Sequence, residues 1–221
     1  MIKHFFVVGC LAIGCTFNLP ATPISAPPIA VALEEHPRQD QVAIASKALS
    51  PLLEAIADVE GGSQALNAVN RGYAGDTPGG SLQVLGRSLA DMTVLEVMHA
   101  QRRTVYAVGA YQFIPETLEE LVNRSGFDVS RRFDREVQQE LAVLNIKHNR
   151  PHVWRYVLGE PVSAYEAALE MAKEWASLGH PADNFSYYQG LGGNQAKVPT
   201  QFVSSVLADA RGTLSQPLPI R

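Results

Sequence analysis

The pattern of apolar and polar positions is clearest in residues 50–62, with the sequence SPLLEAIADVEGG. Ser50 suits a helix N-cap and Pro51 suits the first helical position, whereas two glycines after Glu60 favour a helix end. The sequence therefore predicts a helix that begins at Ser50 and runs through Glu60. At about 100° per residue, its apolar stripe consists of Leu49, Leu53, Ile56, Ala57 and Glu60.

Glu60 is an unusual member of this stripe because its side chain is a carboxyl group. Burial removes hydration from a carboxylate, and the C-terminus of a helix adds partial negative charge beside it. Both effects are expected to raise the pKa of Glu60, as a general acid requires. The alternative is a structural carboxylate bonded to a nearby backbone N–H or to an arginine, and the helix alone does not decide between the two.

Residues 61–80 contain six glycines, so they predict a loop with turns rather than a helix. We expect a small β-hairpin here, continued by the strand-like segment LQVLGRSL at residues 82–89. A glycine-rich loop after an inward-facing carboxyl group can line a cleft, because bare backbone lets a bulky ligand approach. A mobile surface loop is the alternative.

Helix signals recur along the rest of the chain. Capping boxes open predicted helices at Thr93 and Ser163, and Asp134 caps a third. Further helical segments are expected to begin at Pro115, Pro151 and Pro199, and Gly179 is expected to end the helix that begins at Ser163. The prediction is a mostly helical α+β domain with six or seven helices and one minor β element.

The N-terminal region reads differently. Residues 1–32 combine Lys3, an apolar run of 11 residues from Phe5 to Cys15, and an Ala-Val-Ala ending, which together predict a secretory signal peptide. The run is too short to span a bilayer as a helix. We therefore expect an exported protein with no membrane segment after cleavage. A lipoprotein is the alternative, because residues 12–15 partly resemble a lipobox.

The expected domain organisation follows from these boundaries. Residues 33–49 form a polar linker and the start of the first helix, residues 50–212 form one domain, and residues 213–221 form a C-terminal tail. Both cysteines lie in the signal peptide, so the mature chain is expected to have no disulfide.

Charge and motifs exclude several classes of protein. The formal net charge is −4, and it becomes −5 without the signal peptide, which argues against a nucleic-acid partner. His148 and His152 have the spacing of helical metal ligands, but Pro151 separates them and no third ligand accompanies them, so no metal is predicted. Serine-nucleophile and phosphate-binding glycine motifs are absent from the sequence, and we expect no cofactor.

Three stretches resemble a known family. They are IADVEGG at residues 56–62 with NAVN at 67–70, VGAYQFIPET at 108–117, and WASL at 175–178 with YYQG at 187–190. In this order and spacing they are similar to the lysozyme-like superfamily, in particular to the lambda-endolysin type of lytic transglycosylase. The resemblance spans about residues 50–212 and implies a lysozyme-like catalytic domain.

The resemblance also implies roles for individual residues. Glu60 matches the catalytic acid/base, and Tyr111 with Gln112 matches a pair that lines the cleft. Tyr187 and Tyr188 match an aromatic position of a late loop, and Asn70 belongs to the loop after the catalytic helix. Together with Tyr111 and Gln112, these residues are expected to bind the substrate. The AGDTPGG loop and residues 82–98 depart from the family pattern.

Asp76 decides the mechanism that we predict. If its carboxylate faces Glu60, the pair favours hydrolysis, whereas a single carboxylate favours the transglycosylase reaction that the resemblance implies. The competing interpretation of Asp76 is a turn residue that bonds its own backbone. Trp154 and Trp175 lie on predicted helix faces, and we expect both in the core.

The predicted function is that of a monomeric exported enzyme. It would cleave the β-1,4 bond between N-acetylmuramic acid and N-acetylglucosamine in the glycan strands of peptidoglycan, as muramidases and lytic transglycosylases do. A non-catalytic peptidoglycan-binding or assembly protein with the same fold is one alternative. A chitinase-like glycosidase is the other, because chitin shares half of this substrate.

Overall fold

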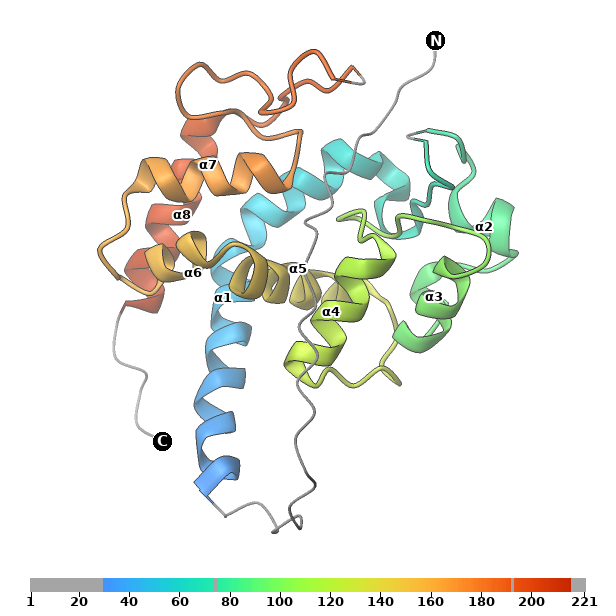
Figure 1. Cartoon of the computed structure of the whole chain (residues 1–221), viewed down its shortest axis with the longest axis horizontal. Helices are drawn as coiled ribbons and strands as arrows, with labels where there is room; N and C mark the ends of the chain where they lie inside the picture. Colours follow the sequence, from blue (N-terminus) through green and yellow to red (C-terminus); the bar gives the residue numbers. More distant parts are fainter. Residues whose placement is uncertain (1–29, 74, 192, 216–221) are drawn as a thin grey trace, which may run out of the picture.

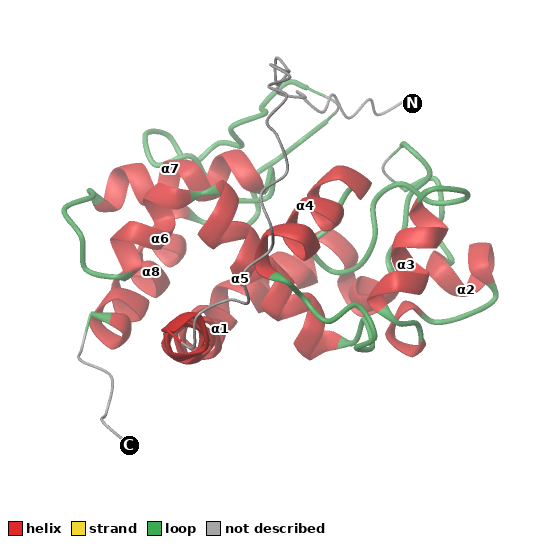
Figure 2. Cartoon of the chain, turned by 60° about the horizontal axis from the view of Figure 1, so that its bottom comes forward, coloured by secondary structure: helices red, strands yellow, loops and turns green. Residues whose placement is uncertain are grey.

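The computed structural model describes residues 30–73, 75–191 and 193–215, and within them the chain is mostly helical, with long loops between the helices (Figures 1 and 2). Residues 1–29 of the expected signal peptide, with both cysteines, lie outside the described residues. The α-helices are α1 (Ala30–Gly61), α2 (Gly80–Leu85), α3 (Val94–Gln101), α4 (Pro115–Ser125), α5 (Arg135–Asn149), α6 (Pro151–Val157), α7 (Ala164–Glu174) and α8 (Thr200–Leu214). Two short 3-10 helices, η1 (Gly62–Asn67) and η2 (Leu89–Asp91), lie between them.

The first helix is much longer than predicted. It begins at Ala30 rather than at Ser50, so the polar linker expected at residues 33–41 is helical. Ser50 does not cap it; its hydroxyl donates to Glu54 Oε1 at 3.0 Å within the helix. The local start signal is overridden because the apolar stripe continues toward the N-terminus through the buried residues Val42, Ala45, Leu49, Leu52, Leu53 and Ile56.

Helix α5 lies at the centre of the fold, where it packs against α1, α4 and α6 (Figure 1). It is buried over most of its circumference, and two of its buried residues, Gln138 and Asn145, are polar. Helix α5 therefore contributes core residues to its contacts with these three helices. The predicted start at Asp134 is confirmed, since its side chain accepts a hydrogen bond from Val137 N at 3.0 Å. Pro151 separates α5 from α6, as predicted.

The predicted β-hairpin and strand are wrong. Residues 82–89 fall in α2 and in the turn into η2, because Asn67 Oδ1 accepts from Leu89 N at 2.9 Å and from Ser88 Oγ at 2.7 Å. These bonds pair polar groups of the segment with a nearby side chain, so the segment does not need a neighbouring strand to pair them. In the described residues the β structure is limited to isolated bridges, among them Val69 with Val108 and Val108 with Phe113. The fold is mostly helical, as predicted, without the β-sheet that an α+β domain requires.

Both predicted capping boxes, at Thr93 and Ser163, are present. Helix α7 ends at Glu174 instead of at Gly179, because the chain beyond it turns to pair with residues 197 and 198: both of their N–H groups donate to Ser177 O. Trp154 and Trp175 are buried, as predicted. None of the described helices has the length and apolar character needed to cross a membrane.

Candidate active site

Glu60 lies in the last turn of α1, where it is half-buried. No other described residue forms a hydrogen bond or an ion pair with its carboxylate. A structural carboxylate would be bonded to a backbone N–H or to an arginine, and the described residues contain no such partner for Glu60. Directly after Glu60 the chain folds back, since a Cβ on Gly61 would lie 2.9 Å from Ala65 Cβ and 3.4 Å from Ala68 Cβ.

Two of the predicted binding residues, Asn70 and Gln112, are in direct contact. Asn70 Nδ2 donates to Gln112 Oε1 at 3.0 Å, and Gln112 Nε2 donates to Gly109 O at 2.8 Å. Asn70 Oδ1 accepts from Gly72 N at 3.1 Å and from Ala107 N at 3.4 Å. The two carboxamides thus join the loop after η1 to the turn between α3 and α4.

The backbone holds this carboxamide pair at both ends. Ala68 O accepts from Gly109 N at 2.8 Å, and Asn70 N donates to Ala107 O at 3.0 Å. Gln112 has a φ of 51°, in the left-handed region that residues with a Cβ rarely adopt. Because Ala68 also lies against Gly61, this turn is positioned beside the end of α1.

Gln138 is a positioning residue that sequence reasoning missed. It is fully buried on α5, and its Nε2 donates to Leu66 O at 3.0 Å and to Phe133 O at 2.8 Å. Its Oε1 accepts from Ala110 N at 2.8 Å. One side chain therefore ties η1, the turn that carries Gln112 and the start of α5 together. The only available signal was a glutamine beside the apolar stripe of a helix.

Tyr111 is part of the core, with 8% of its surface exposed. Its ring packs edge-on against Phe113 and Trp175, with centroids 5.9 and 6.4 Å away. Burial raises the pKa of the Tyr111 hydroxyl to about 12; the charge of Glu54 adds to this effect and that of Arg135 opposes it. The ring offers little surface to a ligand. Tyr111 therefore holds the turn that carries Gln112 against the core.

The Asp76 carboxylate is engaged by its own loop. Its two oxygens accept from Arg71 N at 3.1 and 3.0 Å, and one of them also accepts from Tyr73 N at 3.4 Å. Thr77 Oγ1 donates to the other at 3.2 Å. This is the arrangement expected of a carboxylate that closes a turn.

Tyr187 and Tyr188 lie in the late loop, which we define as residues 179–199. They differ in environment: Tyr188 donates its hydroxyl to Lys173 O at 2.8 Å, whereas Tyr187 is 46% exposed. Burial raises the pKa of Tyr188. Tyr187 stacks on His180 with ring centroids 6.2 Å apart, and Lys173 Nζ lies 5.9 Å from its centroid. Tyr188 therefore anchors the loop, whereas the ring of Tyr187 stays partly exposed to solvent.

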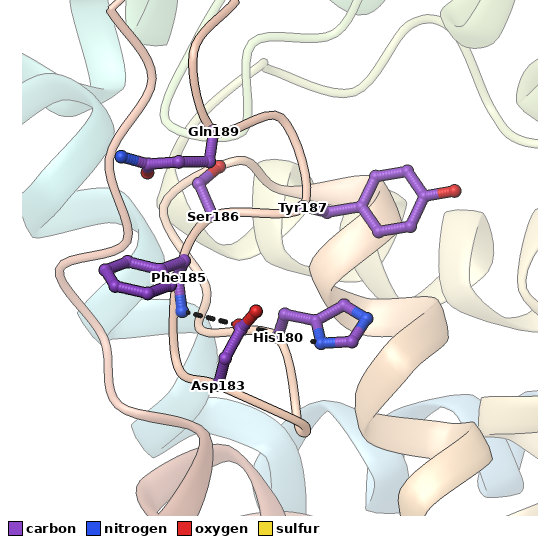
Figure 3. Close-up of a pocket in the computed structure, with 6 residues that line it drawn as sticks. All are labelled: His180, Asp183, Phe185, Ser186, Tyr187 and Gln189. Atoms are coloured by element: carbon purple, nitrogen blue, oxygen red, sulfur yellow. Dashed lines mark hydrogen bonds and ion pairs between the residues drawn. The ribbon is translucent and has the colours of Figure 1, made fainter.

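Two cavities lie outside this group of residues. One of about 340 Å³ is formed by the late loop (Figure 3), and one of about 1240 Å³ lies between the middle of α1, the end of α4 with the segment after it, and α5. Neither is lined by Glu60, Asn70 or Gln112. The larger cavity reaches α1 only as far as Ser50, ten residues before Glu60 or about 15 Å along the helix.

No three His, Cys, Asp or Glu side chains gather closely enough among the described residues to hold a metal ion. A scan against protein-family models, a search of curated proteins and a search of solved structures find no match to this chain. What indicates a function for this chain is the geometry of these side chains and the resemblance of the sequence stretches that contain them.

Proposed function

We propose that this protein is an exported lytic transglycosylase with a lysozyme-like domain over residues 50–212. Its substrate is the β-1,4 bond between N-acetylmuramic acid and N-acetylglucosamine in peptidoglycan, and Glu60 is its acid and base. One contrast carries the proposal: the carboxylate of Glu60 has no partner in the described chain, whereas that of Asp76 is engaged by four hydrogen bonds. This contrast supports a site with a single catalytic carboxylate.

A single carboxylate is sufficient when the substrate supplies its own nucleophile. Protonated Glu60 donates its proton to the glycosidic oxygen, and the bond from that oxygen to C1 of the muramic acid residue breaks. The resulting carboxylate then accepts the proton of the sugar's 6-hydroxyl group while the 6-oxygen bonds to C1. Glu60 ends in its starting state, and one product carries a 1,6-anhydro ring.

Asn70 and Gln112 have hydrogen-bonding capacity left for the substrate. Each carboxamide has two N–H donors and an oxygen with two lone pairs. Their mutual bond, the bond from Gln112 Nε2 to Gly109 O and the two backbone N–H groups bonded to Asn70 Oδ1 leave one N–H on each residue and one lone pair on Gln112 Oε1. Their remaining donors and acceptors match hydroxyl and acetamido groups of a sugar. Because Gln138 and Tyr111 support the same turn from the core, the pair is preorganised for binding.

Mass spectrometry of purified peptidoglycan digested with the full chain tests this proposal. We expect soluble fragments that end in 1,6-anhydro-N-acetylmuramic acid. Fragments with reducing ends would replace the transglycosylase with a hydrolase and would return Asp76 to consideration. Retention on sacculi without any released fragment would favour a non-catalytic binding protein, and release from chitin oligomers alone would favour a chitinase-like enzyme.

A further inference from the structure

A buried glutamine at the end of α3 is hydrogen-bonded through one half of its carboxamide only. Gln101 is the last residue of α3 and has 7% of its surface exposed. Its Nε2 donates to Tyr106 O and to Phe113 O, each at 2.8 Å. Its Oε1 is buried and has no hydrogen-bond partner among the described residues. Most buried polar atoms in proteins are paired, so an unpaired one requires a specific explanation.

The orientation of this carboxamide follows from the two carbonyl groups that it meets. If the side chain were turned over, Oε1 would face both carbonyl oxygens and no N–H would lie between them. The observed orientation pairs both carbonyls and leaves Oε1 unpaired. A methionine is similar in length and would place no unpaired oxygen in the core, but it has no N–H to donate. The contribution of Gln101 therefore comes from its two hydrogen bonds.

These two bonds reach both ends of the turn that carries Gln112, residues 106–113. Within the turn, Val108 N donates to Phe113 O and Phe113 N donates to Val108 O, both at 3.0 Å. The turn is thus closed by its own backbone, and Gln101 joins its first and last residues to α3.

Each of the two carbonyls lies next to one member of the carboxamide pair. Tyr106 N donates to Asn70 O at 2.6 Å, so the residue that Gln101 holds at one end also holds the backbone of Asn70. Phe113 follows Gln112 directly in the chain. One buried side chain therefore fixes the backbone beside both members of the pair.

The backbone of Gln112 makes such support necessary. Its φ of 51° lies in the left-handed region, and a residue with a Cβ stays there only where the surrounding structure fixes it. Gln138 holds Ala110 N before this residue, and Gln101 holds Phe113 O after it. The turn is thus fixed on both sides of its strained residue.

We propose that Gln101 is a positioning residue of the candidate active site. Through two backbone carbonyls it fixes the orientation of Asn70 and Gln112 toward each other. Its effect on cleavage rests on the proposed function, whereas its support of the carboxamide pair rests on the hydrogen bonds alone.

NMR spectroscopy of the full chain tests the support of the pair, because the side-chain NH₂ groups of Asn70 and Gln112 give separate signals. Gln101→Met keeps the length of the side chain and removes both donors, so we expect the NH₂ signals of both residues to shift. Gln101→Asn, which is too short to reach both carbonyls, is expected to shift them less and serves if Gln101→Met does not fold. Gln139→Met removes one bond, to Ser46 O, and is the matched control that should leave these signals unchanged.

A double-mutant cycle on the rate of anhydro-fragment release tests the effect on the reaction. Gln101→Met should lower the rate about tenfold in the wild-type background, since a displacement of about 1 Å at a catalytic site can cost up to about 100-fold. In a Gln112→Ala background the pair is already lost, so the same change should lower the rate by less than about twofold. Gln139→Met should leave both rates unchanged.

The outcomes separate this inference from the proposed function. Unchanged NH₂ signals in the folded Gln101 variants would overturn the inference, whether or not the wild type cleaves peptidoglycan. Shifted signals with equal losses of rate in both backgrounds would overturn the role in the reaction, because Gln101 would then act on stability alone. Shifted signals in a protein that releases no fragments would support the positioning of the pair and remove the proposed activity.

Discussion

The end of α1 and the loop of residues 71–76 each carry a carboxylate, and the two differ in their hydrogen bonds. The oxygens of Asp76 are bonded to the backbone of Arg71 and Tyr73 and to Thr77, whereas the half-buried Glu60 has no partner among the described residues. An ionisable group that is partly buried and unpaired contributes nothing evident to stability. A carboxylate without hydrogen-bond partners is therefore a candidate acid, whereas one whose oxygens are bonded by its own loop is a structural residue.

The largest expected effect comes from replacing Glu60 with Gln. This change keeps the shape of the side chain and removes its proton, and general acid–base catalysis is typically worth about 10²- to 10⁴-fold. We expect the release of peptidoglycan fragments to fall by that factor, as measured by mass spectrometry, with no change in the midpoint of thermal unfolding. Asp58→Asn, an exposed change on the same helix, is the control. If Glu60→Gln released peptidoglycan fragments as fast as the wild type, Glu60 would not be the catalytic acid.

Replacing Gln138 with Ala tests the support that this side chain gives to η1 and to the turn that carries Gln112. The change leaves Leu66 O and the buried groups Phe133 O and Ala110 N without their partner, so we expect a loss of about 3 kcal/mol in the free energy of unfolding. Denaturant unfolding measures it. The neighbouring Gln139→Ala removes one bond, to Ser46 O, and should cost about 1 kcal/mol. Equal losses for the two variants would contradict the positioning role of Gln138.

Tyr111→Phe tests whether the turn that carries Gln112 is part of the core. The raised pKa of Tyr111 means that the folded chain resists ionisation, so its contribution is present below pH 10 and is lost as the pH rises from 10 through about 12. We expect wild-type unfolding free energy to fall by roughly 2 kcal/mol more than that of the variant by pH 12. Tyr165→Phe, at an exposed position, should behave as wild type. Identical alkaline curves for wild type and Tyr111→Phe would place the hydroxyl in solvent.

The smallest expected effect is that of Asp76→Asn. The substitution keeps one acceptor oxygen but loses the charge that strengthens the loop's hydrogen bonds, so it should cost about 1 kcal/mol of stability. We expect turnover to stay within about threefold of wild type, since general acid–base catalysis would be worth far more. A loss of turnover as large as that of Glu60→Gln would give Asp76 a catalytic role and sharpen the mechanism toward hydrolysis.

Local signals in the sequence predicted much of the helical structure. The capping boxes at Thr93 and Ser163 each satisfy backbone groups within four residues, so no knowledge of the fold is needed to identify them. The start predicted at Ser50 was wrong for the opposite reason. Packing of α1 against α5 and α8 extends that helix, and this packing depends on residues far away in the sequence.

The candidate site was predictable only in part. Asn70 and Gln112 were named from their resemblance to family stretches, and the structure brings them to 3.0 Å from each other. Gln138 was missed because its three partners lie at residues 66, 110 and 133, and no pattern within one helix indicates such distant bonds.

The left-handed backbone at Gln112 has a consequence for sequence variation. Glycine and asparagine are the residues that adopt a positive φ most readily, but neither reaches as far as the glutamine side chain that bonds Asn70 Nδ2 and Gly109 O. Residues with enough length carry the conformational penalty instead. Residue 112 must therefore adopt a positive φ and also carry a side chain long enough to form these bonds. In a library of all substitutions at this position, we expect many folded proteins but very few active ones.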